Sequence, residues 1–171
     1  MAAILGDFLS KFFFYAITFL TAGIYWYNHV QIMRRIKFID QGFFWLNLVF
    51  FLFITTLPFT ASLYNTVEDP GFNTILIYSG NNVINGTLLI VVWLYASRGY
   101  RLITKEVKPY EIPLTTWQIA VMPTTAALSI IATLIIGPEL GVAAYYIVPA
   151  TMSTAVGVAQ GRARRKHEGI N

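Results

Sequence analysis

The fold is decided by an uncharged stretch at residues 43–64, which reads FFWLNLVFFLFITTLPFTASLY. About 20 apolar residues in a helix cross the hydrocarbon core of a bilayer, which is about 30 Å thick. A chain segment inside lipid must satisfy its own backbone hydrogen bonds, so a segment of this kind has to be helical. The stretch therefore predicts a membrane-spanning helix. We expect Pro58 to kink it, with the hydroxyls of Thr55 and Thr56 bonding to the freed carbonyls.

The composition extends this prediction to the rest of the chain. Of the 171 residues, 56% are hydrophobic and only 12% are charged, with a mean hydropathy of +0.60. A soluble domain usually has about 25% charged residues. Spans are predicted at about 12–28, 43–64, 74–96, 116–137 and 140–159. We expect an all-α polytopic membrane bundle of five transmembrane helices, with one domain at residues 1–160 and a basic tail at 161–171.

The positive charges predict the orientation of this bundle. They cluster after the first, third and fifth spans, as Arg34, Arg35 and Lys37, then Arg98, Arg101, Lys105 and Lys108, then Arg162, Arg164, Arg165 and Lys166. Loops rich in Lys and Arg lie on the cytoplasmic side of a membrane. We therefore expect a cytoplasmic C-terminus and an N-terminus outside, where residues 1–11 form an amphipathic surface segment. Topology explains the basic residues, so we expect no nucleic-acid partner.

Polar residues inside or beside the spans are the candidate functional residues, because they are costly to place in lipid. The first and second spans are antiparallel neighbours, so the end of the first and the start of the second lie at the same depth in the membrane. The predicted inter-helix polar network consists of Trp26, Asn28, His29, Trp45 and Asn47. A simple interfacial aromatic belt is the alternative for Trp26 and its neighbour Tyr27.

A second polar group lies in the middle of the third span. Asn81 and Asn85 are four residues apart and share a helix face, and Asn82 lies beside them. Such residues either form hydrogen bonds between helices or face water. The sequence leaves both interpretations open.

No catalytic or metal site is indicated. The chain has no cysteine, which excludes thiol catalysis, disulfides and Cys-ligated metals. His29 is the only histidine near a span, and no cluster of carboxylates could complete a metal site. The sequence also offers no nucleophile–base pair, no paired carboxylates and no phosphate-binding loop. We therefore expect no enzyme and no cofactor.

Two motifs resemble the transmembrane protein 175 family, the lysosomal potassium channel and its prokaryotic homologues. One is YWYNH at residues 25–29, and the other is WLNL followed by LPF within residues 45–59. The matching residues are Tyr25, Trp26, Asn28, His29, Trp45, Asn47, Leu48, Leu57, Pro58 and Phe59. The detailed resemblance covers residues 14–63, and Val30 departs from it because many homologues have a second histidine there.

The resemblance implies a potassium-permeable channel subunit that forms a homotetramer around a central pore in a lipid bilayer. It also implies a prokaryotic cell membrane as the location. In that family the pore is lined by a first helix with an Arg…Phe-Ser-Asp signature, which the network residues contact. We expect this helix to have no counterpart here, so the pore-lining residues remain unknown. A non-conducting scaffold or accessory subunit is the alternative, and a small-molecule transporter is a third possibility.

Overall fold

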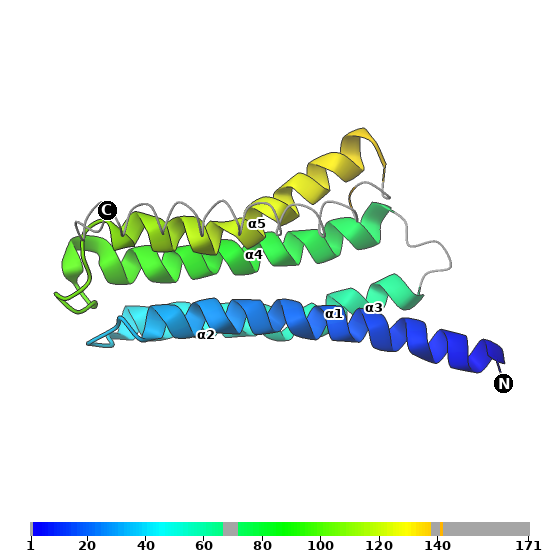
Figure 1. Cartoon of the computed structure of the whole chain (residues 1–171), viewed down its shortest axis with the longest axis horizontal. Coiled ribbons are helices and arrows are strands. Elements are labelled where there is room, and N and C mark those ends of the chain that lie inside the picture. The colour runs from blue at the N-terminus through cyan, green and yellow to red at the C-terminus, as the bar shows by residue number, and fades with distance from the viewer. Residues whose placement is uncertain (1, 67–71, 138–140, 142–171) are drawn as a thin grey trace, which may run out of the picture.

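A computed structural model describes residues 2–66, 72–137 and 141 of the chain (Figure 1). Its elements are α1 (Ala2–Met33), α2 (Gln41–Thr55), α3 (Leu57–Thr66), α4 (Phe72–Ser97), the 3₁₀ helix η1 (Arg98–Tyr100) and α5 (Glu111–Ile135). The predicted all-α class is therefore confirmed for these ranges. Apart from Gly141, the predicted fifth span and the basic tail lie outside the described residues.

Three stretches within the described ranges are long and apolar enough to cross a membrane, namely Gln41–Leu63, Phe72–Tyr100 and Glu111–Ile135. They contain nearly all of the second, third and fourth predicted spans. The first predicted span lies within α1, whose 32 residues correspond to about 48 Å of helix. That α1 crosses the membrane stays a prediction. Residues 1–11 were expected to form an amphipathic segment on the membrane surface. From Ala2 onwards they are instead the first turns of α1.

The predicted kink at Pro58 is a break between α2 and α3 at Thr56. Proline lacks an amide N–H, and its ring clashes with the carbonyl four residues earlier, so Pro58 disfavours continuation of the α2 hydrogen-bond ladder. The hydroxyl of Thr55 donates to the carbonyl of Leu52 at 2.8 Å, and that of Thr56 donates to the carbonyl of Phe53 at 2.7 Å. The two hydroxyls therefore supply donors where the helix loses them.

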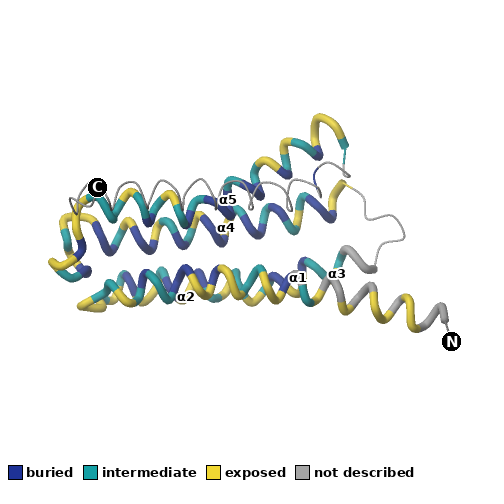
Figure 2. Tube along the Cα trace, viewed as in Figure 1, coloured by how far each residue is buried: buried dark blue, intermediate teal, exposed yellow. Residues whose placement is uncertain are grey.

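Helix α4 forms the centre of the bundle. It packs along α5 and also contacts α2, α3 and α1 (Figure 1). Figure 2 shows dark-blue buried positions recurring along α4 from end to end. The largest core side chains on α4 include Trp93, Leu89 and Val92, which are fully buried. The described protomer is therefore closely packed around α4.

One glycine permits the tight contact between α4 and α5. A Cβ atom added to Gly86 would collide with the ring of Pro123, which lies inside α5. Glycine lets the two helices approach closely, as small residues commonly do between membrane helices. This contact sets the spacing of the α4–α5 pair.

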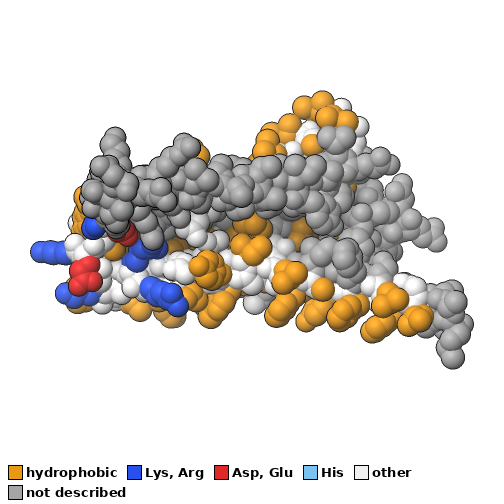
Figure 3. Space-filling model, viewed as in Figure 1, with side chains coloured by type: hydrophobic (Ala, Val, Ile, Leu, Met, Phe, Trp, Pro, Cys, Tyr) orange, Lys and Arg blue, Asp and Glu red, His pale blue; other side chains and the backbone are white. Residues whose placement is uncertain are grey.

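The loop after α1 and the loop after η1 are joined at one end of the bundle. The amide of Lys37 donates to the carbonyl of Leu102 at 2.7 Å, and the amide of Thr104 donates to the carbonyl of Arg35 at 3.0 Å. Ile36 and Ile103 form an antiparallel β-bridge between these bonds. The first two basic clusters of the sequence therefore lie at the same end of the molecule, where Figure 3 shows the blue side chains.

Candidate functional site

A single turn of α1 makes a polar contact with each of the other long helices. Asn28 and His29 come three and four residues after Tyr25, so the three side chains lie on one side of α1. Tyr25 contacts α4, Asn28 contacts α5 and His29 contacts α2. All three side chains are buried. This turn is where the orientation of α1 relative to the bundle is fixed.

The contact with α2 joins the imidazole of His29 to the amide of Asn47. The Nε2 atom of His29 lies 2.7 Å from the Oδ1 atom of Asn47. The Nδ2 atom of Asn47 donates to the carbonyl of Phe43 at 2.7 Å, which assigns its Oδ1 atom as the acceptor toward His29. His29 therefore carries a hydrogen on Nε2 and donates it to Asn47. The bond fixes both the ring orientation and the tautomer.

Aromatic rings surround the His29 imidazole. It stacks on Phe50 with centroids 5.5 Å apart and planes 10° apart, and on Trp26 at 6.0 Å. Phe51 presents its edge to the imidazole at 5.0 Å. The Nδ1 atom of His29 is buried without a hydrogen-bond partner among the described residues. Packing and one hydrogen bond, rather than an ion pair, therefore hold this side chain.

The two tryptophans of the predicted network lie on its outer side. The side chains of Trp26 and Trp45 are 58% and 54% exposed, respectively. Trp26 stacks on His29 and contacts Phe51 at a tilt, whereas Trp45 makes an edge-to-face contact with Phe44 of its own helix. Exposed indoles near helix ends match the positions of an interfacial aromatic belt. The role of these residues as one functional network stays a prediction.

Asn28 points away from the His29–Asn47 pair. Its Oδ1 atom accepts a hydrogen bond from Nε2 of Gln118 at 3.5 Å, which connects α1 to α5. The hydroxyl of Tyr25 donates to the backbone carbonyl of Asn82 at 2.8 Å, which connects α1 to α4. Gln118 was not among the predicted site residues, and Tyr25 was predicted only as part of the family motif. The spacing of Tyr25 relative to Asn28 and His29 is the signal that could have identified it.

The asparagines of α4 face the break between α2 and α3. Asn81 donates from Nδ2 to Oγ1 of Thr60 at 3.3 Å and accepts at Oδ1 from Oγ1 of Thr56 at 3.3 Å. Asn85 donates from Nδ2 to the carbonyl of Phe53 at 3.2 Å. The same Nδ2 atom lies 3.1 Å and 3.2 Å from the backbone and side-chain oxygens of Asn81. Both asparagines are buried, so they hold α4 against the broken helix.

Asn82 differs from its two neighbours. Its Nδ2 atom donates to the carbonyl of Tyr78 in the same helix at 3.0 Å. The Oδ1 atoms of Asn82 and Asn85 are buried without partners among the residues that the structure describes. Side-chain bonding between helices therefore accounts for Asn81 and Asn85 but does not account for Asn82.

The polar interior is neutral. Its members are amides, hydroxyls, one imidazole and a phenol, and in the described ranges no group of acidic, His or Cys side chains could hold a metal ion. Neutral hydrogen-bonding groups can join helices or accept a partly dehydrated ion or water molecule. They do not form a constellation for acid–base or nucleophilic chemistry.

Comparison with known proteins identifies relatives of the chain. A family model described as "Endosomal/lysosomal potassium channel TMEM175" matches residues 1–58. A chicken (Gallus gallus) protein named "Endosomal/lysosomal proton channel TMEM175" is 30% identical over 103 residues. The aligned region covers 60% of this chain but only 20% of the chicken protein, so the chain spans about a fifth of that relative.

The family match contains the contacts that α1 makes with α2. Residues 1–58 include Trp26, Asn28 and His29 on α1 and Trp45 and Asn47 on α2. The family consists of channels rather than enzymes, in agreement with the prediction that the chain is not an enzyme. The resemblance noted in the two sequence motifs is confirmed by both matches, which relate residues 1–58 to the TMEM175 family model and 103 residues of the chain to the chicken TMEM175 protein.

Proposed function

We propose that the chain is a subunit of an oligomeric ion channel that conducts potassium ions across a membrane. The observation that carries this proposal is the family match over residues 1–58, whose description names a potassium channel. The apolar stretches Gln41–Leu63, Phe72–Tyr100 and Glu111–Ile135 give the chain the composition of an integral membrane protein. A homotetramer with a central pore follows from the resemblance and belongs to the same proposal.

The packing of the described protomer favours a pore between subunits over one within a subunit. Trp93, Leu89 and Val92 fill the centre around α4 and are fully buried. Close-packed apolar side chains leave no hydrated path for an ion. Closed cyclic assemblies of identical subunits are common, and they create a central axis where such a path can form.

In this proposal the polar turn of α1 orients the helix within the subunit. Its three contacts, made by Tyr25, Asn28 and His29, reach α4, α5 and α2. A helix bonded through one side to three neighbouring helices cannot rotate about its own axis without breaking a buried hydrogen bond. We infer that the network fixes which face of α1 is turned toward a neighbouring subunit.

Proton conduction is the second candidate, because the chicken relative is named a proton channel. The two ions can be distinguished in one experiment. Purified protein is reconstituted into liposomes loaded with a potassium salt and diluted into a large organic cation, with a pH-sensitive dye inside. The lumen acidifies only when potassium can leave and protons can enter.

The additive that produces acidification then identifies the conductance. A potassium-selective channel acidifies the lumen after a protonophore alone is added, whereas a proton-selective channel requires valinomycin alone. A channel that conducts both ions needs neither additive. If acidification requires both additives, as in protein-free liposomes, the chain as given does not conduct. The non-conducting scaffold or accessory subunit would then replace the channel proposal.

A further inference from the structure

The two basic loops form a fixed unit rather than two independent segments. The bonds between Lys37 and Leu102 and between Thr104 and Arg35 span 2.7 and 3.0 Å, and the Ile36–Ile103 bridge lies between them. Leu102 and Ile103, which take part in this pairing, are buried. Charges on the two loops are therefore held at set positions, although the loops are far apart in the sequence.

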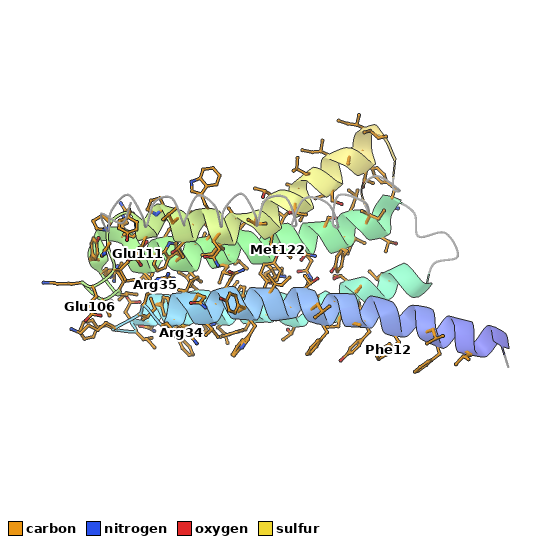
Figure 4. The ribbon with its side chains drawn as sticks, viewed as in Figure 1. Phe12, Arg34, Arg35, Glu106, Glu111 and Met122 are labelled. Carbon is orange, nitrogen blue, oxygen red and sulfur yellow. The ribbon has the colours of Figure 1, made fainter. Side chains whose placement is uncertain are left out.

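Most of the positive charge on this unit is exposed. We define the basic plate as the exposed side chains of Arg34, Lys37, Arg98, Lys105 and Lys108. Arg101 is paired instead with Asp40, with its Nη2 atom 2.8 Å from Oδ2 of Asp40. Arg35 donates to the carbonyl of Gln31 at 3.2 Å and lies over the ring of Trp93. Figure 4 shows that Arg34 and Arg35 lie at the opposite end of α1 from Phe12.

Exposed apolar side chains adjoin the basic plate. Phe38 and Ile39 directly follow Lys37 and are 61% and 64% exposed, respectively. The ammonium of Lys37 lies over the Phe38 ring, 5.3 Å from its centroid. Asp40 caps the first turn of α2, where its Oδ1 atom accepts from the amide of Phe43 at 2.8 Å. The apolar pair therefore lies just before the stretch Gln41–Leu63, which is long and apolar enough to cross a membrane.

We propose that the basic plate binds the phosphate-bearing headgroups of anionic phospholipids. Its cations match the phosphate charge, and the paired loops hold them in place before the lipid binds. Phe38 and Ile39 favour a lipid over a soluble polyanion, because they enter the interfacial region next to the bound headgroup. The proposal concerns a surface outside the polar interior and does not depend on ion conduction.

The test measures the affinity of the full chain for lipids of different charge. The protein is purified in a neutral detergent and mixed with brominated phosphatidylserine or brominated phosphatidylcholine, whose bromine atoms quench tryptophan fluorescence. Trp45 is exposed one turn after the start of α2 and reports on lipid near the plate. We expect phosphatidylserine to bind about fivefold or more tightly than phosphatidylcholine at low salt. The ratio should fall as salt rises.

Three variants distinguish lipid binding at the basic plate from nonspecific attraction to the net positive charge of the protein. Lys37→Gln should weaken phosphatidylserine binding about fivefold, because one cation near a membrane surface contributes roughly that factor. Lys11→Gln removes the same charge near the opposite end of α1 and should leave the lipid ratio unchanged. Thr104→Pro removes the amide that donates to Arg35 without changing the charge, so it should weaken binding through loss of the loop pairing.

The outcomes decide the proposal in each case. Equal binding of the two lipids, or an effect of Lys11→Gln as large as that of Lys37→Gln, overturns it. A folded Thr104→Pro variant with unchanged lipid preference also overturns it, since diffuse charge would then suffice. If Thr104→Pro does not fold, a Lys37→Gln, Lys105→Gln double variant takes its place and must lose the preference. Free inorganic phosphate that displaces the lipid at equal concentration would contradict the choice of a lipid ligand.

Discussion

The Nε2 atom of His29 on α1 donates a hydrogen bond to the Oδ1 atom of Asn47 on α2, with the two atoms 2.7 Å apart. Both side chains are buried, and Asn47 uses its Nδ2 atom to bond the carbonyl of Phe43. The Oδ1 and Nδ2 atoms of Asn47 therefore each have a defined partner, and the His29 imidazole must carry its hydrogen on Nε2. The bond connects two helices within the segment that the TMEM175 family model matches.

Replacing Asn47 with leucine should destabilise the protein, because the buried Nε2–H of His29 loses its acceptor. We expect a loss of about 0.6–1.7 kcal/mol, the range of hydrogen bonds between membrane helices. Thermal unfolding in detergent measures this loss. Trp45→Phe, at an exposed position two residues earlier, should change stability by less than about 0.5 kcal/mol.

A double variant tests whether the pair acts as a unit. His29→Phe combined with Asn47→Leu removes both partners and leaves an apolar contact, so its cost should be smaller than the sum of the two single costs. Additive costs would mean that the two side chains stabilise the bundle independently, in contradiction to the 2.7 Å contact.

Asn85→Ala should cost more stability than Asn82→Ala. The Asn85 amide bonds the carbonyl of Phe53 in α2, beside the helix break, whereas the Asn82 amide bonds only the carbonyl of Tyr78 within α4. Both asparagines are fully buried, so the two variants leave cavities of the same kind. The difference, expected at about 0.6–1.7 kcal/mol, reports the inter-helix bond. Equal losses in thermal unfolding would show that the helix break does not depend on Asn85.

A methyl group at Gly86 should force α4 and α5 apart. Gly86→Ala places its Cβ atom against the Pro123 ring, and overpacking of this kind typically costs about 1–3 kcal/mol. Gly80→Ala is the matched control, because in the part of the chain that the structure describes no atom beyond its chain neighbours and the adjacent turns of its own helix lies within 4 Å of the added Cβ. In the helix interior the control should stabilise by about 0.5–1 kcal/mol. A Gly86→Ala protein as stable as the control variant would contradict the close contact.

Asp40 should make stability depend on acidity. The amide of Phe43, the hydroxyl of Tyr95 and the guanidinium of Arg101 favour its charged form and hold its pKa below the ordinary value of 3.8. A carboxyl whose pKa is lower in the folded state stabilises the protein above its unfolded pKa, and this contribution disappears as pH falls through the folded pKa.

Asp40→Asn tests this dependence while keeping a side chain that caps helices well. We expect wild type to melt at a higher temperature than the variant at neutral pH. The two melting temperatures should converge as pH falls below 3.8 through the lowered pKa of Asp40. A difference that persists unchanged into stronger acid would assign the effect to packing rather than to the charge.

Part of the candidate site was predictable from residue type and spacing. The kink was expected at Pro58 because proline removes a backbone donor from the helix ladder, and the break occurs at Thr56. Asn81 and Asn85 share a face of α4 because they are four residues apart, and both bond toward the broken helix. These features depend on local backbone geometry, which the sequence specifies directly.

The partners of Asn28 and His29 were not predictable in the same way. The two residues are adjacent in sequence and were grouped with Asn47, yet His29 bonds to α2 and Asn28 bonds to Gln118 of α5. Successive residues of a helix point about 100° apart, so two residues that are neighbours in the sequence can contact different helices. Only the packing of α1 against the bundle determines which helix each one meets.

The sequence alone predicted apolar helices with basic clusters at alternate connections, because burial in lipid requires continuous uncharged segments and internal backbone bonding and Lys and Arg gather on one side of a membrane. It also determined the position of the helix break through Pro58. The tertiary structure decided the pairings: His29 with Asn47, Asn85 with the carbonyl of Phe53, and Lys37 with the carbonyl of Leu102. Those pairings depend on the rotation and spacing of whole helices, which are set by the packing of the entire bundle rather than by any single segment.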